Sequence, residues 1–210
     1  MSAEIASARL RVVKLGGSLL DWPAFPDRIR DWLLRQPPAC NVLIAGGGPF
    51  ADVVRSADQL HGLGEGLSHR LCINLLSITA QLVAHLLPEA VGPFAPERIE
   101  PGFDSRLVLL DVPKLIELDA SRSPRPLPSS WEVTTDSIAA RAAVLLRADE
   151  LVLLKSALPP PILPLRELAA SGYVDAQFPI CAKSLEQIRL VNLRSELFCE
   201  QHYTMNRSPR

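Results

Sequence analysis

Two glycine-rich segments and a lysine are the residues of this sequence that could most readily do chemistry. Positions 12–18 read VVKLGGS, in which Lys14 ends an apolar run, and positions 44–50 read IAGGGPF. Glycine lets backbone N–H groups approach a phosphate closely, and a helix beginning at such a loop adds partial positive charge. Lys14 supplies a full charge. The candidate phosphate-binding residues are Gly16, Gly17, Ser18, Gly47 and Gly48.

Each glycine loop taken alone has a simpler interpretation. Neither segment is the GxxxxGK[ST] loop or the GxGxxG fingerprint, and a lone glycine pair is typical of a tight strand-to-helix turn. Two such loops, one of them with a lysine, favour phosphate binding instead. In a parallel sheet both loops emerge at the carboxyl ends of their strands, so we expect them to face one site.

Asp136 is a third candidate, in the segment WEVTTDSIAARAA at 131–143. Thr134 or Thr135 can cap a helix here, which places Asp136 in the first helical turn. An aspartate at that position interacts favourably with the helix dipole, and in isolation this would be a sufficient reason for it.

The elements that must position these residues alternate along the chain. Short apolar runs predict strands at 10–15, 41–45, 107–111 and 151–155. Apolar residues at helical spacing predict helices at 23–35, 50–60, 67–87 and 138–146. Alternation of this kind is typical of a layered α/β domain with a parallel sheet.

The composition favours a single globular domain and gives no sign of a nucleic-acid-binding, metal-binding or membrane protein. The chain has 210 residues, 48% of them hydrophobic, which favours one domain over 1–199 followed by a polar tail at 200–210. The net charge of -1 gives no indication of a nucleic-acid partner. Four scattered cysteines indicate neither a metal site nor a disulfide framework. No stretch is apolar enough for a membrane helix or a secretory leader, so we expect a cytoplasmic protein.

The order of these motifs resembles the amino-acid kinase family, which includes the acetylglutamate, aspartate and uridylate kinases. The resemblance lies in KLGGS, in AGGGPF with Asp52 one turn later, and in TTDSIAA before an LVLLK strand. It implies a three-layer α/β/α sandwich with a mainly parallel central sheet, and phosphoryl transfer from ATP, with Mg²⁺, to a small phosphate or carboxylate substrate. It also implies a homo-oligomer, with a dimer formed through residues 67–87.

The resemblance also implies roles for individual residues. Lys14 would stabilise charge on the transferred phosphoryl group, the glycine loops would donate N–H groups to it, and Asp136 would orient the lysines. Phosphoryl transfer depends mainly on positioning and charge stabilisation, which lysine and backbone amides provide.

Within the family, the sequence most resembles a small branch that includes the aminomethylfuran-methyl phosphate kinase of methanofuran-type cofactor synthesis. The shared segments are HGLGEGLSHRLCINLLSITAQLVAHLL, WEVTTDSIAARAA and GYVDAQF. By this resemblance the substrate, in methanofuran- or pterin-linked one-carbon metabolism, would contact Gly46, Asp52, His69 and Asn74. From the residues alone, His69 could equally be a partly exposed helix histidine, and Asp52 fits a solvated helix face.

The sequence departs from the family pattern at the expected nucleotide loop. After the LVLLK strand the chain reads KSALPPP, with Pro159 to Pro161 where the family has an acidic, glycine-containing turn. A second catalytic lysine would be Lys155 at the strand end or, with shifted spacing, Lys183. These departures leave open a second function class, a kinase-fold protein that transfers no phosphate and serves as a ligand-binding or assembly subunit.

Overall fold

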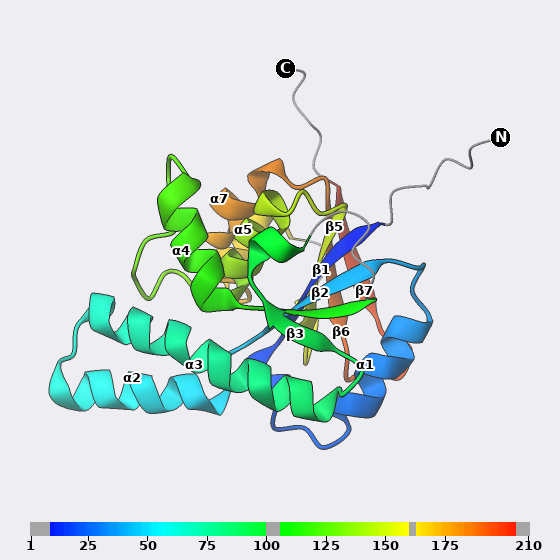
Figure 1. Cartoon of the computed structure of the whole chain (residues 1–210), viewed down its shortest axis with the longest axis horizontal. Helices are drawn as coiled ribbons and strands as arrows, with labels where there is room; N and C mark the ends of the chain where they lie inside the picture. Colours follow the sequence, from blue (N-terminus) through cyan, green and yellow to red (C-terminus); the bar gives the residue numbers. More distant parts are fainter. Residues whose placement is uncertain (1–8, 100–105, 160–162, 205–210) are drawn as a thin grey trace.

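The described part of the chain folds around a seven-stranded sheet (Figure 1). The computed structural model describes residues 9–99, 106–159 and 163–204. Pro160 and Pro161 of the expected nucleotide loop lie outside the described residues. The strands are β1 (Leu10–Leu15), β2 (Cys40–Ala45), β3 (Val91–Phe94), β4 (Leu107–Leu110), β5 (Glu150–Lys155), β6 (Gln187–Asn192) and β7 (Glu200–Thr204). The α-helices are α1 (Phe25–Leu34), α2 (Pro49–His61), α3 (Glu65–Leu86), α4 (Val112–Arg122), α5 (Thr135–Leu145), α6 (Leu165–Ala170) and α7 (Phe178–Cys181), and the short 3₁₀ turns are η1 (Gly17–Leu19), η2 (Pro96–Arg98) and η3 (Ala182–Ser184).

The strand order places β1 at the centre of the sheet. The order is β3-β4-β2-β1-β5-β6-β7, and every neighbouring pair is parallel except β6 with β7. Lys14 of β1 lies beside Ile44 of β2 and Leu153 of β5. The chain leaves β1 toward β2 on one side and later returns to β5 on the other. This reversal beside β1 is where open α/β sheets commonly bind ligands.

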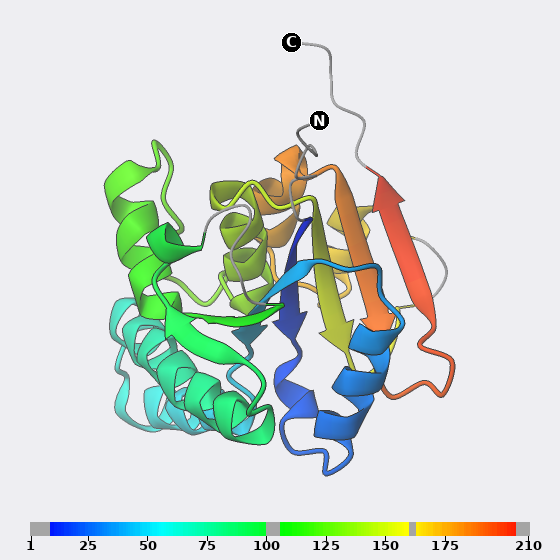
Figure 2. The same ribbon diagram turned by 45° about the vertical axis from the view of Figure 1, so that its right-hand side comes forward.

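Side chains that alternate along the strands form two cores, one on each face of the sheet. Val12 and Leu153 pack with α5 and the first half of α3 on one face. Val13 and Val152 pack on the other face with Trp32 of α1 and the end of α3. Figure 2 shows α1 and α5 on opposite sides of the sheet. Helices on both faces of a mainly parallel sheet confirm the expected three-layer α/β/α architecture.

The expected elements near the glycine loops match the structure closely. Strand β1 has the predicted bounds, and β2, β4 and β5 differ from prediction by one residue. Strands β3, β6 and β7 and helices α4, α6 and α7 were not predicted. Strand β6, with the sequence QIRLVN, includes polar residues that weaken the signal of a buried strand.

The prediction that residues 200–210 form a polar tail is wrong for residues 200–204. Residues 200–204 form β7, which pairs antiparallel with β6 from Val191↔Glu200 to Gln187↔Thr204. The segment is polar because it is an edge strand with half-buried and exposed side chains. Residues 205–210 lie outside the part of the chain that the structure describes.

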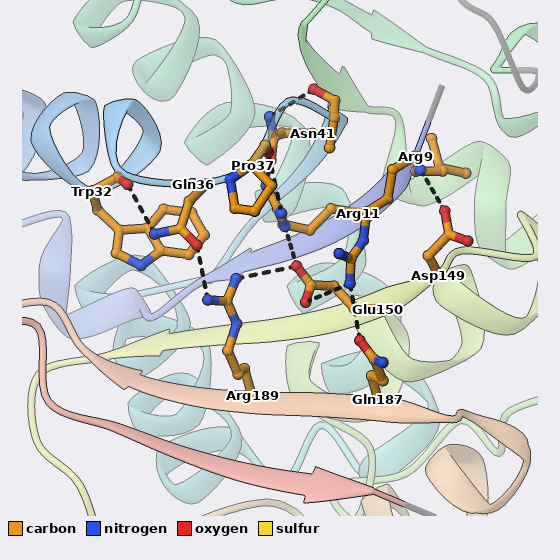
Figure 3. A network of polar contacts seen from close by, with 12 residues as sticks. Arg9, Arg11, Trp32, Gln36, Pro37, Asn41, Asp149, Glu150, Gln187 and Arg189 are labelled. Atoms are coloured by element: carbon orange, nitrogen blue, oxygen red, sulfur yellow. Dashed lines mark hydrogen bonds and ion pairs between the residues drawn. The ribbon is translucent and has the colours of Figure 1, made fainter. Parts of the chain in front are cut away.

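A polar network joins the amino-terminal ends of the central strands (Figure 3). The carboxylate of Glu150 on β5 is paired with Arg11 of β1 and, at 3.1 Å, with Arg189 of β6. Arg11 also donates to Asn41 Oδ1 at 2.9 Å. Burial opposes ionisation of Glu150, but the hydrogen bond and charge of Arg11 outweigh it and lower its pKa. This network ties β1, β2, β5 and β6 together at the edge of the sheet away from the glycine loops.

Helix α3 has an exposed apolar side. Leu67, Leu71 and Ile78 are 38%, 37% and 49% exposed. The expectation of a dimer through residues 67–87 stays a prediction, which light scattering on the purified protein can test. Among the described residues, no helix is both long enough and apolar enough to span a lipid bilayer.

Candidate active site

Asp136 lies between two lysines at the carboxyl edge of the sheet. Lys14 Nζ is 2.9 Å from Asp136 Oδ1, and Lys155 Nζ is 2.7 Å from Asp136 Oδ2. The lysines come from the adjacent strands β1 and β5, and Asp136 comes from the first turn of α5, which Thr134 caps. The three side chains are 7%, 16% and 6% exposed for Lys14, Lys155 and Asp136. Lys14 can therefore lie in a buried strand, one residue before its end, because a buried carboxylate pairs with it.

The electrostatics of this group favour ionised Asp136. Burial raises the cost of its negative charge, but the charges of Lys14 and Lys155 outweigh that cost, so its pKa lies below the ordinary value. Burial and the neighbouring charge of Lys14 lower the pKa of Lys155. A single carboxylate thus holds two lysine side chains close together at the sheet edge.

The ammonium group of Lys155 has further contacts within the protein besides Asp136. Its Nζ also donates to the carbonyl oxygen of Tyr173 at 2.6 Å and lies 4.7 Å from the centre of the Tyr173 ring. Tyr173 Oη donates in turn to the carbonyl oxygen of Ala157 at 2.9 Å. Two of the three N–H donors of Lys155 are used within the protein. Lys183, the other candidate for a second lysine, is exposed in η3.

The two glycine loops pack directly against each other. A Cβ atom on Gly17 would lie 2.4 Å from the amide nitrogen of Gly48, which is closer than side chains can approach. Gly48 has a φ of 56°, a backbone conformation that favours glycine. The loops that follow β1 and β2 therefore form one surface, as expected from the parallel sheet.

The glycines divide into two groups by the partners of their amides. Gly16 donates its N–H to Leu154 O at 2.8 Å, and Gly46 donates to Leu15 O at 2.9 Å. Within the part of the chain that the structure describes, no backbone hydrogen bond uses the amides of Gly17, Ser18, Gly47 or Gly48. The second group has N–H groups available for a ligand. Gly16 and Gly46 instead join the loops to neighbouring strands.

A cavity of ≈ 380 Å³ opens beside these loops. Its wall includes Lys14, Gly17, Ser18, Gly47 and Gly48 from the loops, Asp52 and Arg55 from α2, His69, Cys72, Ile73 and Leu76 from α3, and Trp131, Thr134, Thr135 and Ile138 from the segment around the start of α5. The available amides and Lys14 therefore face the same space. Neither Asp136 nor Lys155 lines the cavity, so among the three paired side chains only Lys14 faces it.

The structure places two of the four residues expected to contact a substrate in the cavity wall and the other two outside it. Asp52 and His69 line the cavity, whereas Asn74 and Gly46 do not. Asp52 is 70% exposed and pairs with Arg55. His69 is 5% exposed, so it is a buried residue of the cavity wall. Asn74 is exposed on α3, one position beyond the buried Ile73.

Asp175 organises the start of α5, a role that sequence reasoning missed. Its Oδ2 accepts hydrogen bonds from Thr134 N at 3.0 Å, Thr134 Oγ1 at 2.7 Å and Ser137 N at 3.0 Å. These contacts fix the turn that carries Asp136. The segment GYVDAQF contains both Asp175 and Tyr173, and only its family resemblance indicated that it mattered.

Trp131 joins two walls of the cavity and was also missed. Its Nε1 donates to Asp58 Oδ2 of α2 at 3.0 Å, and the Arg55 guanidinium lies 5.6 Å from the centre of its ring. This contact links α2 to the segment that leads into α5. A lone tryptophan in a proline-rich region gives no sequence signal for such a contact.

Comparison with known proteins identifies the family. The model of the amino acid kinase family matches residues 9–157. A curated relative, the [5-(aminomethyl)furan-3-yl]methyl phosphate kinase of Methanocaldococcus jannaschii, is 26% identical over 146 residues. The match covers 69% of this chain and 64% of that relative, so the chain spans less than two thirds of the relative's length.

Solved structures share the fold. The UMP kinase of Bacillus anthracis has a TM-score of 0.61 at 12% identity, with 90% of this chain and 89% of that chain covered. The uridylate kinase of Archaeoglobus fulgidus has a TM-score of 0.56 at 18% identity, with 86% and 89% covered. The aspartate kinase of Synechocystis has a TM-score of 0.57 at 16% identity, with 87% and 37% covered. By its family match, its fold and the order of its motifs, the chain belongs to the amino acid kinase family.

Proposed function

We propose that this protein transfers a phosphoryl group from ATP to a small anionic acceptor bound in the cavity beside the glycine loops. The observation that carries the proposal is the shared carboxylate: Asp136 pairs with Lys14 at 2.9 Å and with Lys155 at 2.7 Å. The loop amides nearby donate to no backbone carbonyl among the described residues. Phosphoryl transfer requires positive charge and aligned donors around the transferred group more than it requires covalent chemistry.

Each residue of this group has a distinct proposed role. Lys14 lines the cavity and stabilises negative charge on the transferred group. The amides of Gly17, Ser18, Gly47 and Gly48 donate hydrogen bonds to its oxygens. Asp136 holds Lys14 in position, and Lys155 acts as a positioning residue through Asp136, because it lies outside the cavity and its donors are largely used.

ATP and Mg²⁺ fit this site in different ways. The unpaired amides and Lys14 suit the phosphate chain of ATP, which supplies the phosphoryl group when bound. Among the described residues, no cluster of three or more His, Cys, Asp or Glu side chains is placed to hold a metal ion. Mg²⁺ commonly binds through substrate phosphates with one or two carboxylates, so it would arrive with ATP.

The acceptor class follows from the cavity wall and from the curated relative. Cys72, Ile73 and Leu76 make part of the wall apolar, whereas the loop amides and Lys14 suit an anionic group. The name of the relative from M. jannaschii states a substrate with an aminomethyl furan ring and a methyl phosphate. We propose an acceptor of this kind, a phosphate ester on a small ring, in methanofuran- or pterin-linked one-carbon cofactor synthesis.

A direct assay tests the proposal. Purified protein is incubated with Mg-ATP and [5-(aminomethyl)furan-3-yl]methyl phosphate, and ADP and the diphosphate product are measured by phosphorus NMR. We expect acceptor-dependent ADP release that slows about 100- to 1,000-fold in Lys14→Ala. Binding of the acceptor without any transfer at millimolar ATP would instead support the second function class, a ligand-binding protein with a kinase fold.

A further inference from the structure

Ser18 of the first glycine loop is bonded to two segments from distant parts of the chain. Its carbonyl oxygen accepts a hydrogen bond from Arg194 Nη2 at 2.8 Å, and its hydroxyl donates to Ser156 Oγ at 3.1 Å. Arg194 lies between β6 and β7, and Ser156 directly follows β5. Both segments lie at the same end of the sheet as the loop after β1 (Figure 2). The contacts of Ser18 therefore join the ends of β1, β5 and β6.

The guanidinium of Arg194 packs against the segment that follows this loop. It lies 5.3 Å from the centre of the Trp22 ring, and its Nη2 lies 3.8 Å from Asp21 Oδ1. An exposed ion pair at this distance stabilises little by itself. The bond to the Ser18 carbonyl is shorter and has a charged donor, so it is the stronger restraint on the loop.

The turn that carries Arg194 is itself anchored. The amides of Arg194 and Ser195 donate to Asn192 Oδ1 at 3.0 and 3.2 Å. Arg28 of α1 donates to the carbonyl oxygen of Ser195 at 2.5 Å, and its guanidinium lies 4.1 Å from the centre of the Phe198 ring. Because the turn is anchored on both β6 and α1, its arginine can hold a neighbouring loop in one place.

The loop that Arg194 contacts is a single short turn. η1 has three residues and is closed by hydrogen bonds from the amides of Leu19 and Leu20. Hydrogen bonds in 3₁₀ turns have poorer geometry than those of an α-helix. The Ser18 carbonyl lies inside this turn, so its bond to Arg194 restrains the peptide groups beside it. These include the amides of Gly17 and Ser18, which donate to no backbone carbonyl among the described residues.

We propose that Arg194 is a positioning residue for phosphoryl transfer: it holds the Ser18 carbonyl, so that the amides of Gly17 and Ser18 stay aligned with the transferred group. Misaligned donors slow the transfer step, because they stabilise the charge of the transition state less well. The inference rests on the proposed function for the reaction, but the restraint on the loop does not depend on transfer.

Steady-state kinetics with Mg-ATP and [5-(aminomethyl)furan-3-yl]methyl phosphate test this role. In Arg194→Ala we expect kcat to fall about 10- to 100-fold while both KM values change less than about threefold. Arg194→Lys recovers part of kcat, because lysine keeps a charged donor. Arg122→Ala is the matched control, since Arg122 also forms an exposed ion pair, with Glu97 at 3.9 Å, and does not line the cavity. It should keep the wild-type constants.

Hydrogen exchange followed by NMR measures the restraint without ATP or acceptor. We expect the amides of Leu19 and Leu20 to exchange about 10- to 100-fold faster in Arg194→Ala, the range for a hydrogen bond with a charged donor. The amide of Ser123, which donates to Asp119 O at the end of α4, is the internal reference and should exchange at the wild-type rate in a folded variant.

Several results would overturn the role of Arg194. They are an unchanged kcat in Arg194→Ala, equal kcat values in Arg194→Ala and Arg194→Lys, or a raised KM for ATP at unchanged kcat, which would indicate direct contact with the nucleotide. If Arg194→Ala does not fold, Arg194→Gln takes its place with the same expected directions of change.

The two measurements also separate this inference from the proposed function. Faster exchange of Leu19 and Leu20 in Arg194→Ala, without any transfer by the wild type, would contradict the proposed function alone. Transfer by the wild type, with unchanged exchange and unchanged kcat in Arg194→Ala, would contradict the role of Arg194 alone.

Discussion

Gly17 and Gly48 lie in contact across the two loops that follow β1 and β2. A Cβ on Gly17 would lie 2.4 Å from the amide nitrogen and 2.7 Å from the Cα of Gly48. Both neighbouring atoms belong to the backbone, so a side chain on Gly17 cannot be accommodated by a rotamer change. The contact explains why both loops are rich in glycine, and it brings the amides of Gly17, Ser18, Gly47 and Gly48 to one surface.

The contact predicts that Gly17→Ala separates the loops. We expect the catalytic rate to fall about 100-fold or more, because donors to the transferred group lose their alignment. Gly66→Ala is the matched control, since a Cβ there meets nothing within 4 Å and alanine favours the helix. Steady-state kinetics check this prediction. Equal rates in the two variants would show that the contact between the loops does not position the donors.

Asp136 is predicted to be necessary for both stability and activity. Asp136→Asn leaves two buried ammonium groups without their shared counter-charge, a loss of about 3–5 kcal/mol in the free energy of unfolding. Urea denaturation measures that loss. We also expect kcat to fall at least about 100-fold, because Lys14 is no longer held in the cavity. A variant of wild-type stability and rate would show that the two lysines do not need the carboxylate.

Glu150 provides a contrast at the opposite edge of the sheet. Glu150→Gln removes the charge that neutralises the buried Arg11, whereas Arg189 keeps Glu200 at 3.2 Å, so unfolding should become easier by about 3–5 kcal/mol. The kinetic constants should change less than about twofold at a temperature where the variant is folded, because the network lies away from the cavity. A large fall in kcat in a folded variant would show coupling between the two edges.

Much of the glycine-loop edge of the sheet could be predicted from the sequence. The KLGGS and AGGGPF loops were interpretable because strand, glycine and helix follow one another locally, and the parallel sheet then brings them together. Asp136 was predictable in the same way from the Thr134 cap. The sequence did not distinguish Gly16 and Gly46 from the other glycines. Their amides donate to the carbonyl oxygens of Leu154 and Leu15, and these contacts depend on the register of the strands, which the sequence does not show.

Residues that reach the site through distant contacts were not predictable. Asp175 bonds Thr134 across 41 positions, and Trp131 bonds Asp58 across 73. Neither has a periodic pattern or a motif of its own. The burial of His69 was equally undetermined, since helical spacing does not show which side of a long apolar helix faces a cavity.

The buried imidazole of His69 predicts a dependence of stability on pH. Its pKa in the folded protein lies below the ordinary value of 6.5 because of burial. The unfolded chain therefore binds the proton first as the pH falls, so the stabilising effect of neutral His69 is present above about pH 6.5 and is lost as pH approaches the lower pKa of the folded state.

Comparison with His69→Leu isolates this effect. Between pH 7.5 and 5.5, the free energy of unfolding of the wild type should fall more than that of His69→Leu, because the other histidines titrate in both proteins. Urea denaturation at each pH measures the difference. Parallel curves would contradict a lowered pKa for His69.

The rate of phosphoryl transfer in a Lys14→Ala variant tests most directly whether Lys14 stabilises the transferred group. Lys114→Ala, which removes an exposed lysine of α4, is the control. With saturating ATP and acceptor, we predict that kcat falls about 100- to 1,000-fold in Lys14→Ala while Lys114→Ala keeps the wild-type value. Undiminished turnover in folded Lys14→Ala would contradict the assignment of this site.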